Sequence, residues 1–454
     1  MNDSHCMEVY KRNYERYNIK KTITPPYILG GVYCKKHAGV PMKTLSERTA
    51  GFTESVIRKM TRVYNQNGAI NLSQGFTESV IRKMTRVSNQ YGAINLSQGF
   101  PDFDPPREIT DRLAEIAGIG PHQYALTWGA QNFREALANK QEHFYGMQVD
   151  PDKEIVVTCG STEAMMAAMM SVCNPGDKVV IFSPFYENYG ADTILSGADP
   201  IYVPLKPPAF NFDEEELEHA IKQQGVKALV LCNPSNPCGK VFTYDELRVI
   251  ADLAIKYDIY VITDEVYEHI VYQPNVHTCI ATLPGMRDRT IICNSLSKTY
   301  SITGWRLGFV MASPKIIDRV KKVHDFLTVG AAAPLMEAAV VGLKFDDSYY
   351  ESLREHYTHM KNLFTNGLKG IGLQFSDPQG AYYVLVDISE FGYESDSVFC
   401  EDLARKVGVG AVPGSSFFKE PENRYIRFHF AKQDATLDEA LNRLADIYTK
   451  MEKR

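Results

Sequence analysis

From about residue 155 onwards, the chain alternates between two patterns of apolar and polar positions. Short apolar runs predict buried strands, because such runs are typical of a sheet covered on both faces. We expect these strands at 155–158, 178–182, 228–232, 259–263, 290–293 and 307–312. Between the runs, apolar residues recur with a helical period, which predicts helices at 161–173, 213–224 and 244–257. This alternation favours βαβ units and a mostly parallel sheet.

The pattern changes after Pro314. It predicts one long helical stretch to about Lys344, which would act as a hinge. Beyond this stretch, the spacing of apolar residues predicts helices at 348–369, 396–407 and 436–452. It also predicts strands at 382–388 and 425–430. We therefore expect an α/β protein. Its large domain, residues 104–344, has a mostly parallel sheet covered by helices, and residues 345–454 form a small α+β domain.

A segment occurs twice in tandem, as residues 51–74 and 75–98. The copies differ only at two pairs of positions, Tyr64/Ser88 and Asn67/Tyr91. Solenoids need three or more units, so two copies indicate a recent duplication or an assembly error. Each copy predicts a short amphipathic helix followed by a strand. Only the second runs into GFPDFDPP, so we expect it to hold the native position and the first to be a surface insert, and deleting either should have the same effect.

Residues 1–41 show no sustained period and include Asp3, Glu8 and Glu15. Transit peptides are poor in acids, and a signal peptide needs an apolar run, so a disordered extension or an error in the gene's boundaries is favoured over targeting. Met42 is a credible alternative start. Residues 42–103 are then expected to form an N-terminal arm and part of the small domain.

Composition and charge exclude some classes of protein but do not identify a binding partner. Of 454 residues, 44% are apolar, which excludes dominant disorder, and the net charge of −6 lacks the basic footprint of a nucleic-acid binder. The nine cysteines include no C-x-x-C pair and no Cys/His cluster, so we expect reduced cytoplasmic thiols and no metal site. No apolar run is long enough to cross a membrane.

Residues with candidate chemistry follow four of the predicted strands. Gly160, Ser161 and Thr162 form a glycine turn that opens a helix, which suits an anion such as phosphate, although Ser and Thr also cap ordinary helices. Asn236 lies in the double-proline turn NPSNPCGK, which taken by itself favours only a tight connection between a strand and a helix.

The next two strands end in ionisable side chains. Asp264 ends a buried strand, with Tyr267 three residues on; a buried carboxylate must pair with a basic residue or with a cationic ligand. Lys298 stands in SLSKTYSITGWR between Ser295 and Arg306, where burial would lower its pKa and make it a nucleophile.

Taken together, N-P-x-N-P, T-D-E-V-Y and S-L-S-K-x-x-x-x-x-G-W-R resemble the fold type I aminotransferases, the class I/II family that uses pyridoxal 5′-phosphate (PLP). The resemblance covers about residues 43–454. It is greatest to the kynurenine, glutamine and methionine aminotransferase branch, through NLSQGFPDF, HQYALTWG and ITDEVYEHIVY. It implies the fold of a fold type I PLP-dependent transferase.

The resemblance also implies roles for individual residues. Lys298 would bond to PLP and carry the proton between the substrate Cα and the cofactor's C4′, while Asp264 would pair with the ring nitrogen. Tyr267 and Asn236 would bond the ring's O3′, and Tyr186 would stack on the ring. The residues that would bind the phosphate are Gly160, Ser161, Thr162, Ser295, Arg306 and a neighbouring subunit's Tyr124. The residues that would bind the substrate are Gly99, Asn236 and Arg427, and the guanidinium of Arg427 would bind the α-carboxylate.

The implied activity is transfer of the amino group of a 2-amino acid, of aromatic, sulfur-containing or other neutral type, to a 2-oxo acid by a ping-pong mechanism. The implied assembly is a homodimer with shared active sites. A PLP-dependent carbon–sulfur β-lyase would use the same Lys298 and Asp264 and stays open. A ligand-sensing regulator is disfavoured, because residues 1–50 show no helix-turn-helix pattern. No second arginine can be placed from sequence at the distal end of a dicarboxylic substrate.

Overall fold

The computed structural model describes residues 79–451. The predictions for residues 1–41 and for the first repeat copy lie outside this range. Within it, no helix has the length and apolar character needed to cross a membrane. The domain boundaries inferred from sequence stay predictions.

Seven strands form the main sheet, in the order β2-β8-β7-β6-β5-β3-β4. Their bounds are β2 (Ile155–Thr158), β3 (Lys178–Ser183), β4 (Asp199–Pro204), β5 (Val226–Cys232), β6 (Tyr260–Asp264), β7 (Thr290–Ser295) and β8 (Gly308–Met311). Only β8 runs antiparallel to its neighbours β2 and β7. The predicted α/β fold with a mostly parallel sheet is confirmed, while the edge strand β4 was missed because prolines and polar residues interrupt its apolar run.

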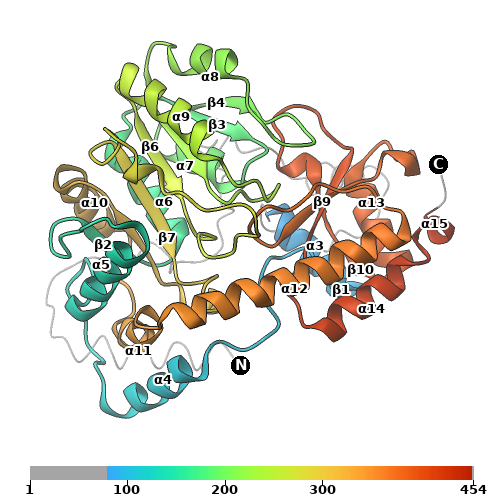
Figure 1. Cartoon of the computed structure of the whole chain (residues 1–454), viewed down its shortest axis with the longest axis horizontal. Helices are drawn as coiled ribbons and strands as arrows, with labels where there is room; N and C mark the ends of the chain where they lie inside the picture. The colour runs from blue at the N-terminus through green and yellow to red at the C-terminus, as the bar shows by residue number, and fades with distance from the viewer. Residues whose placement is uncertain (1–78, 452–454) are drawn as a thin grey trace, which may run out of the picture. The chain divides into compact units, whose positions relative to one another are not determined.

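Helices pack on both faces of this sheet (Figure 1). One face buries α6 (Ser161–Val172), α7 (Asn188–Leu195) and α10 (Pro314–Leu327) against β-strand side chains such as Val156 and Ile262. The other face carries two groups of helices, α5 (Gln131–Tyr145) with α11 (Ala333–Leu343), and α8 (Glu214–Ile221) with α9 (Tyr244–Lys256). Because successive strand residues point to opposite faces, each strand contributes to both cores.

Local signals explain where these helices begin. Thr243 and Glu246 form a capping box at α9, in which Glu246 N–H donates to the Thr243 hydroxyl at 3.2 Å. Asp213 caps α8 by accepting from two backbone N–H groups. α6 begins directly after Gly160, whose φ of +85° is a conformation that favours glycine.

The prediction of one continuous helix from Pro314 to Lys344 is wrong. α10 ends at Leu327 and α11 begins at Ala333. Pro334 occupies the first turn of α11, where its missing N–H costs nothing but where it prevents a helix from continuing through it. The predicted helix at 396–407 changes to a π-helical turn after Asp402, and that at 436–452 is interrupted after Leu444.

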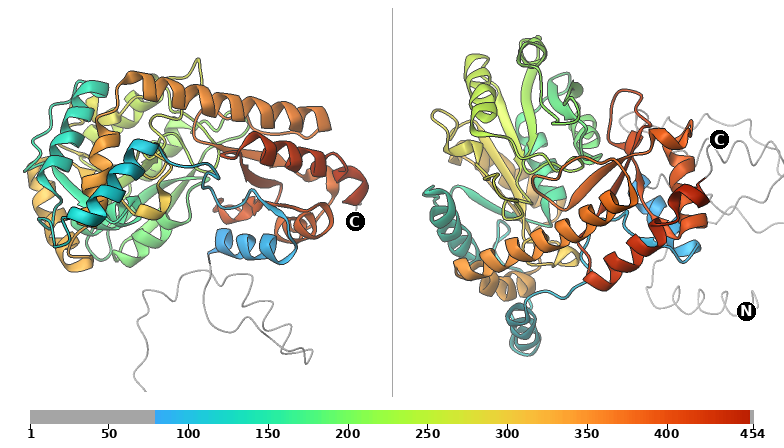
Figure 2. Two further views of the ribbon diagram at one scale, coloured as in Figure 1. Left: turned by 90° about the horizontal axis from the view of Figure 1, so that it is seen from below. Right: turned by 45° about the vertical axis from the view of Figure 1, so that its right-hand side comes forward.

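The C-terminal part has its own core. α12 (Asp347–Ile371) extends from the main sheet to this part, and α14 (Asp434–Leu444) lies beside it (Figure 2). An antiparallel sheet of order β11-β12-β9 packs beneath them. The remaining bounds are α4 (Arg107–Ile119), β9 (Tyr383–Asp387), α13 (Asp396–Asp402), β10 (Val409–Gly410), β11 (Val412–Pro413), β12 (Tyr425–His429) and α15 (Ile447–Lys450).

The described part of the second repeat copy packs in this C-terminal core. It forms α3 (Val80–Gln90) and β1 (Ile94–Asn95), which pairs in parallel with β10. Ser88 is fully buried and donates to the Met84 carbonyl at 2.8 Å. A Cβ on Gly410 would overlap the Ser88 hydroxyl, so helix and strand touch at two small residues.

Candidate active site

A cavity of about 1070 Å³ opens where the strands of the main sheet end, between the sheet and the C-terminal part. Most side chains selected from sequence line it, namely Gly99, Ser161, Thr162, Tyr186, Asn236, Asp264, Tyr267, Ser295, Lys298, Arg306 and Arg427. Gly160 lies directly behind the Arg306 guanidinium. Tyr124 does not line the cavity in this chain and is 90% exposed.

Lys298 follows β7 and projects into the cavity. Its Nζ donates to the Gly99 carbonyl at 3.2 Å and lies 5.9 Å and 5.7 Å from the ring centres of Tyr267 and Tyr382. Burial lowers the pKa of Lys298 to about 8, and the positive charge of Arg306 acts in the same direction. A neutral amine is therefore accessible near physiological pH, as a nucleophile requires.

Asp264 ends β6 and is almost fully buried. The Tyr189 hydroxyl donates to its Oδ2 at 2.7 Å, and the Val266 N–H reaches Oδ1 at 3.4 Å. Burial raises the pKa of Asp264 to about 6, while these two hydrogen bonds act against the rise. The described residues give this carboxylate no direct ion pair, so it suits a cationic ligand in the cavity.

A second acid lies on the same side of the cavity. Asp192 is one turn after Tyr189 on α7 and is 4% exposed, and its Oδ2 has no hydrogen-bond partner within residues 79–451. Burial, and to a smaller extent the charge of Asp264, raises the pKa of Asp192 to about 7. Two acidic side chains thus lie at this end of the cavity.

Positive charge is concentrated at the other end of the cavity, at the start of α6. Ser161 and Thr162 present the helix's free N–H groups, and Arg306 lies beside them with its Nη2 3.5 Å from the Cys159 carbonyl. A Cβ on Gly160 would overlap the Arg306 guanidinium, so glycine is needed for this approach. Free N–H groups, the positive helix end and an arginine together form an anion site.

Arg427 on β12 forms a third charged position. Its guanidinium lies between the rings of Tyr383 and Phe417, 4.3 Å and 4.5 Å from their centres. Nη1 donates to Asn236 Oδ1 at 2.7 Å, and Nη2 donates to a backbone carbonyl at 2.9 Å. Nε is buried and unpartnered among the described residues. The side chain is held rigidly, as recognition of a carboxylate requires.

Two tyrosines link these positions. The hydroxyls of Tyr267 and Tyr383 are 2.9 Å apart, and the absence of a Cβ at Gly99 leaves room for Tyr383. Tyr186 lines the cavity and packs edge-on against Tyr189. Tyr189 and Tyr383 were missed from sequence; the only signal for them was aromatic residues close to Tyr186 and to the strand at 382–388.

The donor set fits PLP. An accessible amine suits the aldehyde, a buried carboxylate with no direct ion pair suits a protonated ring nitrogen, and the anion site at α6 suits a phosphate. Within residues 79–451, no group of three or more His, Cys, Asp or Glu side chains is arranged to hold a metal ion.

Comparison with known sequences agrees with this chemistry. Residues 91–444 match the family model described as aminotransferase class I and II. The chain is 36% identical over 394 residues to the methionine aminotransferase of Escherichia coli, covering 87% of this chain and 96% of that protein. It is 33% identical to human kynurenine–oxoglutarate transaminase 3, covering 75% of this chain and 82% of that protein.

Comparison with solved structures gives the same result for the fold. N-succinyldiaminopimelate aminotransferase from Mycobacterium tuberculosis superposes with a TM-score of 0.79 at 34% identity. The match covers 83% of this chain and 99% of that one.

Proposed function

Because this chain belongs to the class I and II aminotransferases, which are PLP-dependent enzymes, we propose that it moves the amino group of a neutral 2-amino acid to a 2-oxo acid by a ping-pong mechanism. The proposed donors are aromatic, sulfur-containing or other neutral amino acids. Support for this class comes from relatives named for methionine and kynurenine. A biosynthetic role in amino acid metabolism and a cytoplasmic location stay predictions.

One observation carries the proposal: a single cavity holds an amine, a buried acid and an arginine, on Lys298, Asp264 and Arg427. PLP, when bound, supplies an electron-poor ring that stabilises negative charge at the substrate Cα. Arg427 would bind the α-carboxylate and so orient the Cα–H bond. The neutral Lys298 amine would take that proton and return it, since a base must lie within hydrogen-bond reach of the proton it moves.

The other residues of the cavity would bind the cofactor and set its protonation state. Asp264 would keep the ring nitrogen protonated, and the Tyr189 hydroxyl would keep Asp264 ionised. Arg306, Ser295 and the start of α6 would bind the phosphate. Tyr267 and Asn236 would bind the ring oxygen, while Tyr186 would cover one ring face.

The proposal is tested with purified enzyme and a panel of amino donors, each offered with 2-oxoglutarate or pyruvate. We expect transfer with neutral donors and a visible absorbance band from PLP attached to Lys298. In a Lys298→Ala variant, both the band and transfer should be lost, because the amine serves both. Comparable transfer by that variant would overturn the assignment. Release of pyruvate and ammonia from sulfur amino acids without an added oxo acid would identify a β-lyase instead.

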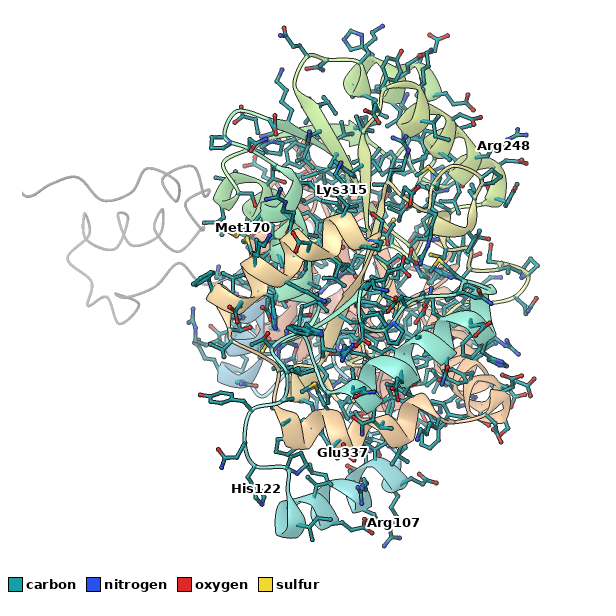
Figure 3. All side chains as sticks on the ribbon, turned by 90° about the vertical axis from the view of Figure 1, so that its left-hand side faces the viewer. Arg107, His122, Met170, Arg248, Lys315 and Glu337 are labelled. Carbon is teal, nitrogen blue, oxygen red and sulfur yellow. The ribbon has the colours of Figure 1, made fainter. Side chains whose placement is uncertain are left out.

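We further propose a homodimer with shared sites. Two surface segments, 119–126 and 326–329, expose large apolar side chains, namely Ile119, Tyr124, Leu126, Phe326, Leu327 and Val329. The second segment reaches the cavity, which Leu327 lines. The segments are neighbours, because a Cβ on Gly330 would contact Thr127. His122 lies at the outer side of the first segment (Figure 3). Apolar exposure on this scale is typical of an interface, and a second copy is the proposed occupant.

A further inference from the structure

Behind Asp264 lies a group of buried ionisable side chains that the proposed function does not use. Glu265 follows Asp264 at the end of β6. Asp264 and Val266 line the cavity, whereas Glu265 between them does not, because successive residues of an extended segment point to opposite sides. Glu265 is 1% exposed, and its Oε1 has no hydrogen-bond partner within residues 79–451. Two buried acids are thus adjacent in the chain, and only one of them faces the cavity.

His277 is the direct partner of Glu265. Its Nε2 lies 2.5 Å from Glu265 Oε2, and its side chain is 5% exposed. On the other side of the ring, His277 Nδ1 lies 3.1 Å from the hydroxyl of Tyr145 on α5. That hydroxyl has a single proton and donates it to Glu268 at 2.6 Å. The four side chains therefore form one continuous series of hydrogen bonds behind Asp264.

The order of donors in this series gives His277 a positive charge. Although burial acts the other way, the charge of Lys140, 2.6 Å away, holds the pKa of Glu268 well below its usual value. Tyr145 therefore donates to an ionised Glu268 and accepts from His277 Nδ1–H. Nε2 is protonated as well, because an imidazole is a stronger base than a carboxylate. Although burial lowers the pKa of His277, the charge of Glu265 raises it above 6.5.

The other ionisable groups around His277 do not supply this positive charge. The Lys140 ammonium pairs with a different acid. Burial lowers the pKa of His269 to about 4, so its ring is neutral, and burial raises the pKa of the Cys279 thiol well above its usual value. Within residues 79–451, His277 is the one cation in direct contact with Glu265.

We propose that His277 is a positioning residue whose imidazolium compensates the charge of Glu265 and so leaves the Asp264 carboxylate ionised to hold the ring nitrogen of PLP protonated. This inference rests on the proposed function and deepens it. Burial raises the pKa of Asp264 to about 6, and the charge of Glu265 contributes to the rise. Without the imidazolium, that charge would act uncompensated and Asp264 would take up a proton near neutral pH. A neutral acid there would no longer stabilise a protonated ring nitrogen.

The test uses His277→Gln, Glu265→Gln and the double variant, because the two substitutions should compensate each other. His277→Gln leaves the charge of Glu265 uncompensated. We therefore expect its kcat for a neutral amino donor to fall by ~10-fold or more, while KM changes by less than ~2-fold. Glu265→Gln removes the charge that needs compensation, so the double variant should regain kcat to within ~3-fold of the unsubstituted enzyme.

Cofactor binding separates an electrostatic role from a structural one. Each apoenzyme is titrated with PLP and with its 1-deaza analogue, in which carbon replaces the ring nitrogen and no proton has to be held. His277→Gln should raise the Kd for PLP by ~10-fold and that for the analogue by less than ~2-fold, and adding Glu265→Gln should restore PLP binding. The matched control is His143→Gln on α5, which removes an exposed contact of 2.6 Å with Asp347 and should change neither Kd.

The outcomes are distinct. Equal losses of affinity for PLP and the analogue, or a loss that persists in the double variant, would assign His277 a purely structural role. Unchanged PLP binding by His277→Gln would show that the charge of Glu265 does not act on Asp264. Any of these results overturns the inference. If the unsubstituted enzyme consumes no oxo acid, the proposed function fails, and the two cofactor titrations still decide whether His277 acts on the ring nitrogen through Asp264.

Discussion

The Asp264 carboxylate depends on a hydroxyl from another element. Tyr189 on α7 donates to it at 2.7 Å, and this hydrogen bond opposes the rise in the pKa of Asp264 that burial causes. Asp192, one turn further, is a second buried acid on the same side, and burial raises its pKa to about 7. Tyr189 is therefore a positioning residue that keeps Asp264 ionised.

We predict that Tyr189→Phe retains PLP but lowers kcat/KM by ~10-fold, because a hydrogen bond to a charged group contributes about 1.5–3 kcal/mol at most. Asp264→Asn should lose ~10²–10⁴ in kcat, as expected for a group that acts directly. A pH titration of the cofactor's absorbance should shift in Tyr189→Phe. The control is Tyr257→Phe, which removes an equally short 2.7 Å bond to Glu218 at the surface. Equal effects of the two tyrosine variants would contradict the prediction.

At the scale of single residues, the sequence located reactive side chains where they directly follow a predicted strand. Lys298 and Asp264 stand directly after apolar runs, and the fold brings the carboxyl ends of parallel strands together. Tyr189 and His277 gave no such signal. What each side chain contacts depends on how segments far apart in the sequence pack together, such as α5, which brings Tyr145 to His277.

At the scale of elements, α6 and α10 are joined by a buried ion pair that supports the anion site. The His324 imidazole donates from Nδ1 to Glu163 at 2.6 Å and from Nε2 to the Thr127 carbonyl at 2.8 Å. Because the lowered pKa of Glu163 keeps it ionised, both partners are acceptors and both ring nitrogens carry protons. Glu163 also accepts from the Cys159 N–H, directly before Gly160. The pair thus fixes the turn that opens α6.

The ion pair between His324 and Glu163 predicts that the stability of the folded protein depends on pH. Its hydrogen bonds and charges raise the pKa of His324 above 6.5 and lower that of Glu163 below 4.5, even though burial alone would shift each the other way. The contribution of His324 is fully present below pH 6.5 and is lost as pH rises through its folded pKa, while that of Glu163 is lost as pH falls below 4.5. We expect His324→Gln to lower the Tm of the holoenzyme by about 2 °C or more near pH 5.5, and by less at pH 9.

The matched control for this prediction is His359→Gln. It removes a solvent-exposed ion pair, in which His359 Nε2 lies 2.8 Å from Asp434 Oδ2. Its effect on Tm should be small at every pH, since exposed pairs contribute little. A pH-independent difference between His324→Gln and the unsubstituted enzyme would show that the imidazole packs there uncharged.

The break between α10 and α11 shows the limit of reading elements from apolar periodicity. Residues 330–343 are apolar enough to continue a helical pattern, and that run outweighed Gly330 and Pro334 in the prediction. The fold instead places Thr328, in the break between the two helices, at the cavity, where its hydroxyl donates to Glu163. Strands such as β6 and β7 were located within one or two residues at each end, because both of their faces are buried.

At the scale of the whole molecule, we predict a dimer whose sites are each completed by the partner. Light scattering should give twice the chain mass of 51.2 kDa. Phe326→Asp should weaken the dimer, because it places a charge among the exposed apolar residues.

Subunit mixing tests the sharing of sites. Lys298→Ala and Tyr124→Phe variants, each impaired alone, should regain activity when their subunits are mixed. One site of the mixed dimer would then combine an intact Lys298 with an intact Tyr124. A fully active monomer, or no recovery on mixing, would contradict shared sites.

The tandem repeat gives a prediction about the whole chain. Residues from the second copy form α3 and β1, so deletion of 51–74 should leave activity unchanged and Tm equal or higher. The expectation that deleting 75–98 would behave alike needs revision, because that deletion puts Tyr64 at the place of Ser88. No space exists there for a phenol beside Gly410, and overpacking of this kind costs about 1–3 kcal/mol. We expect a lower Tm, restored by adding Tyr64→Ser; identical melting of both deletions would contradict this.

The small-residue contact between Ser88 and Gly410 also has a consequence for how the chain folds. Two nearly identical segments compete, within one molecule, for a single groove, and tethering gives each a high effective concentration. Because each ~1.4 kcal/mol corresponds to a tenfold preference, overpacking of about 1–3 kcal/mol by one phenol biases the outcome by roughly 5- to 150-fold. This side chain therefore adds to the preference for the second copy, which alone continues directly into Gly99, and Tyr64→Ser would reduce that preference.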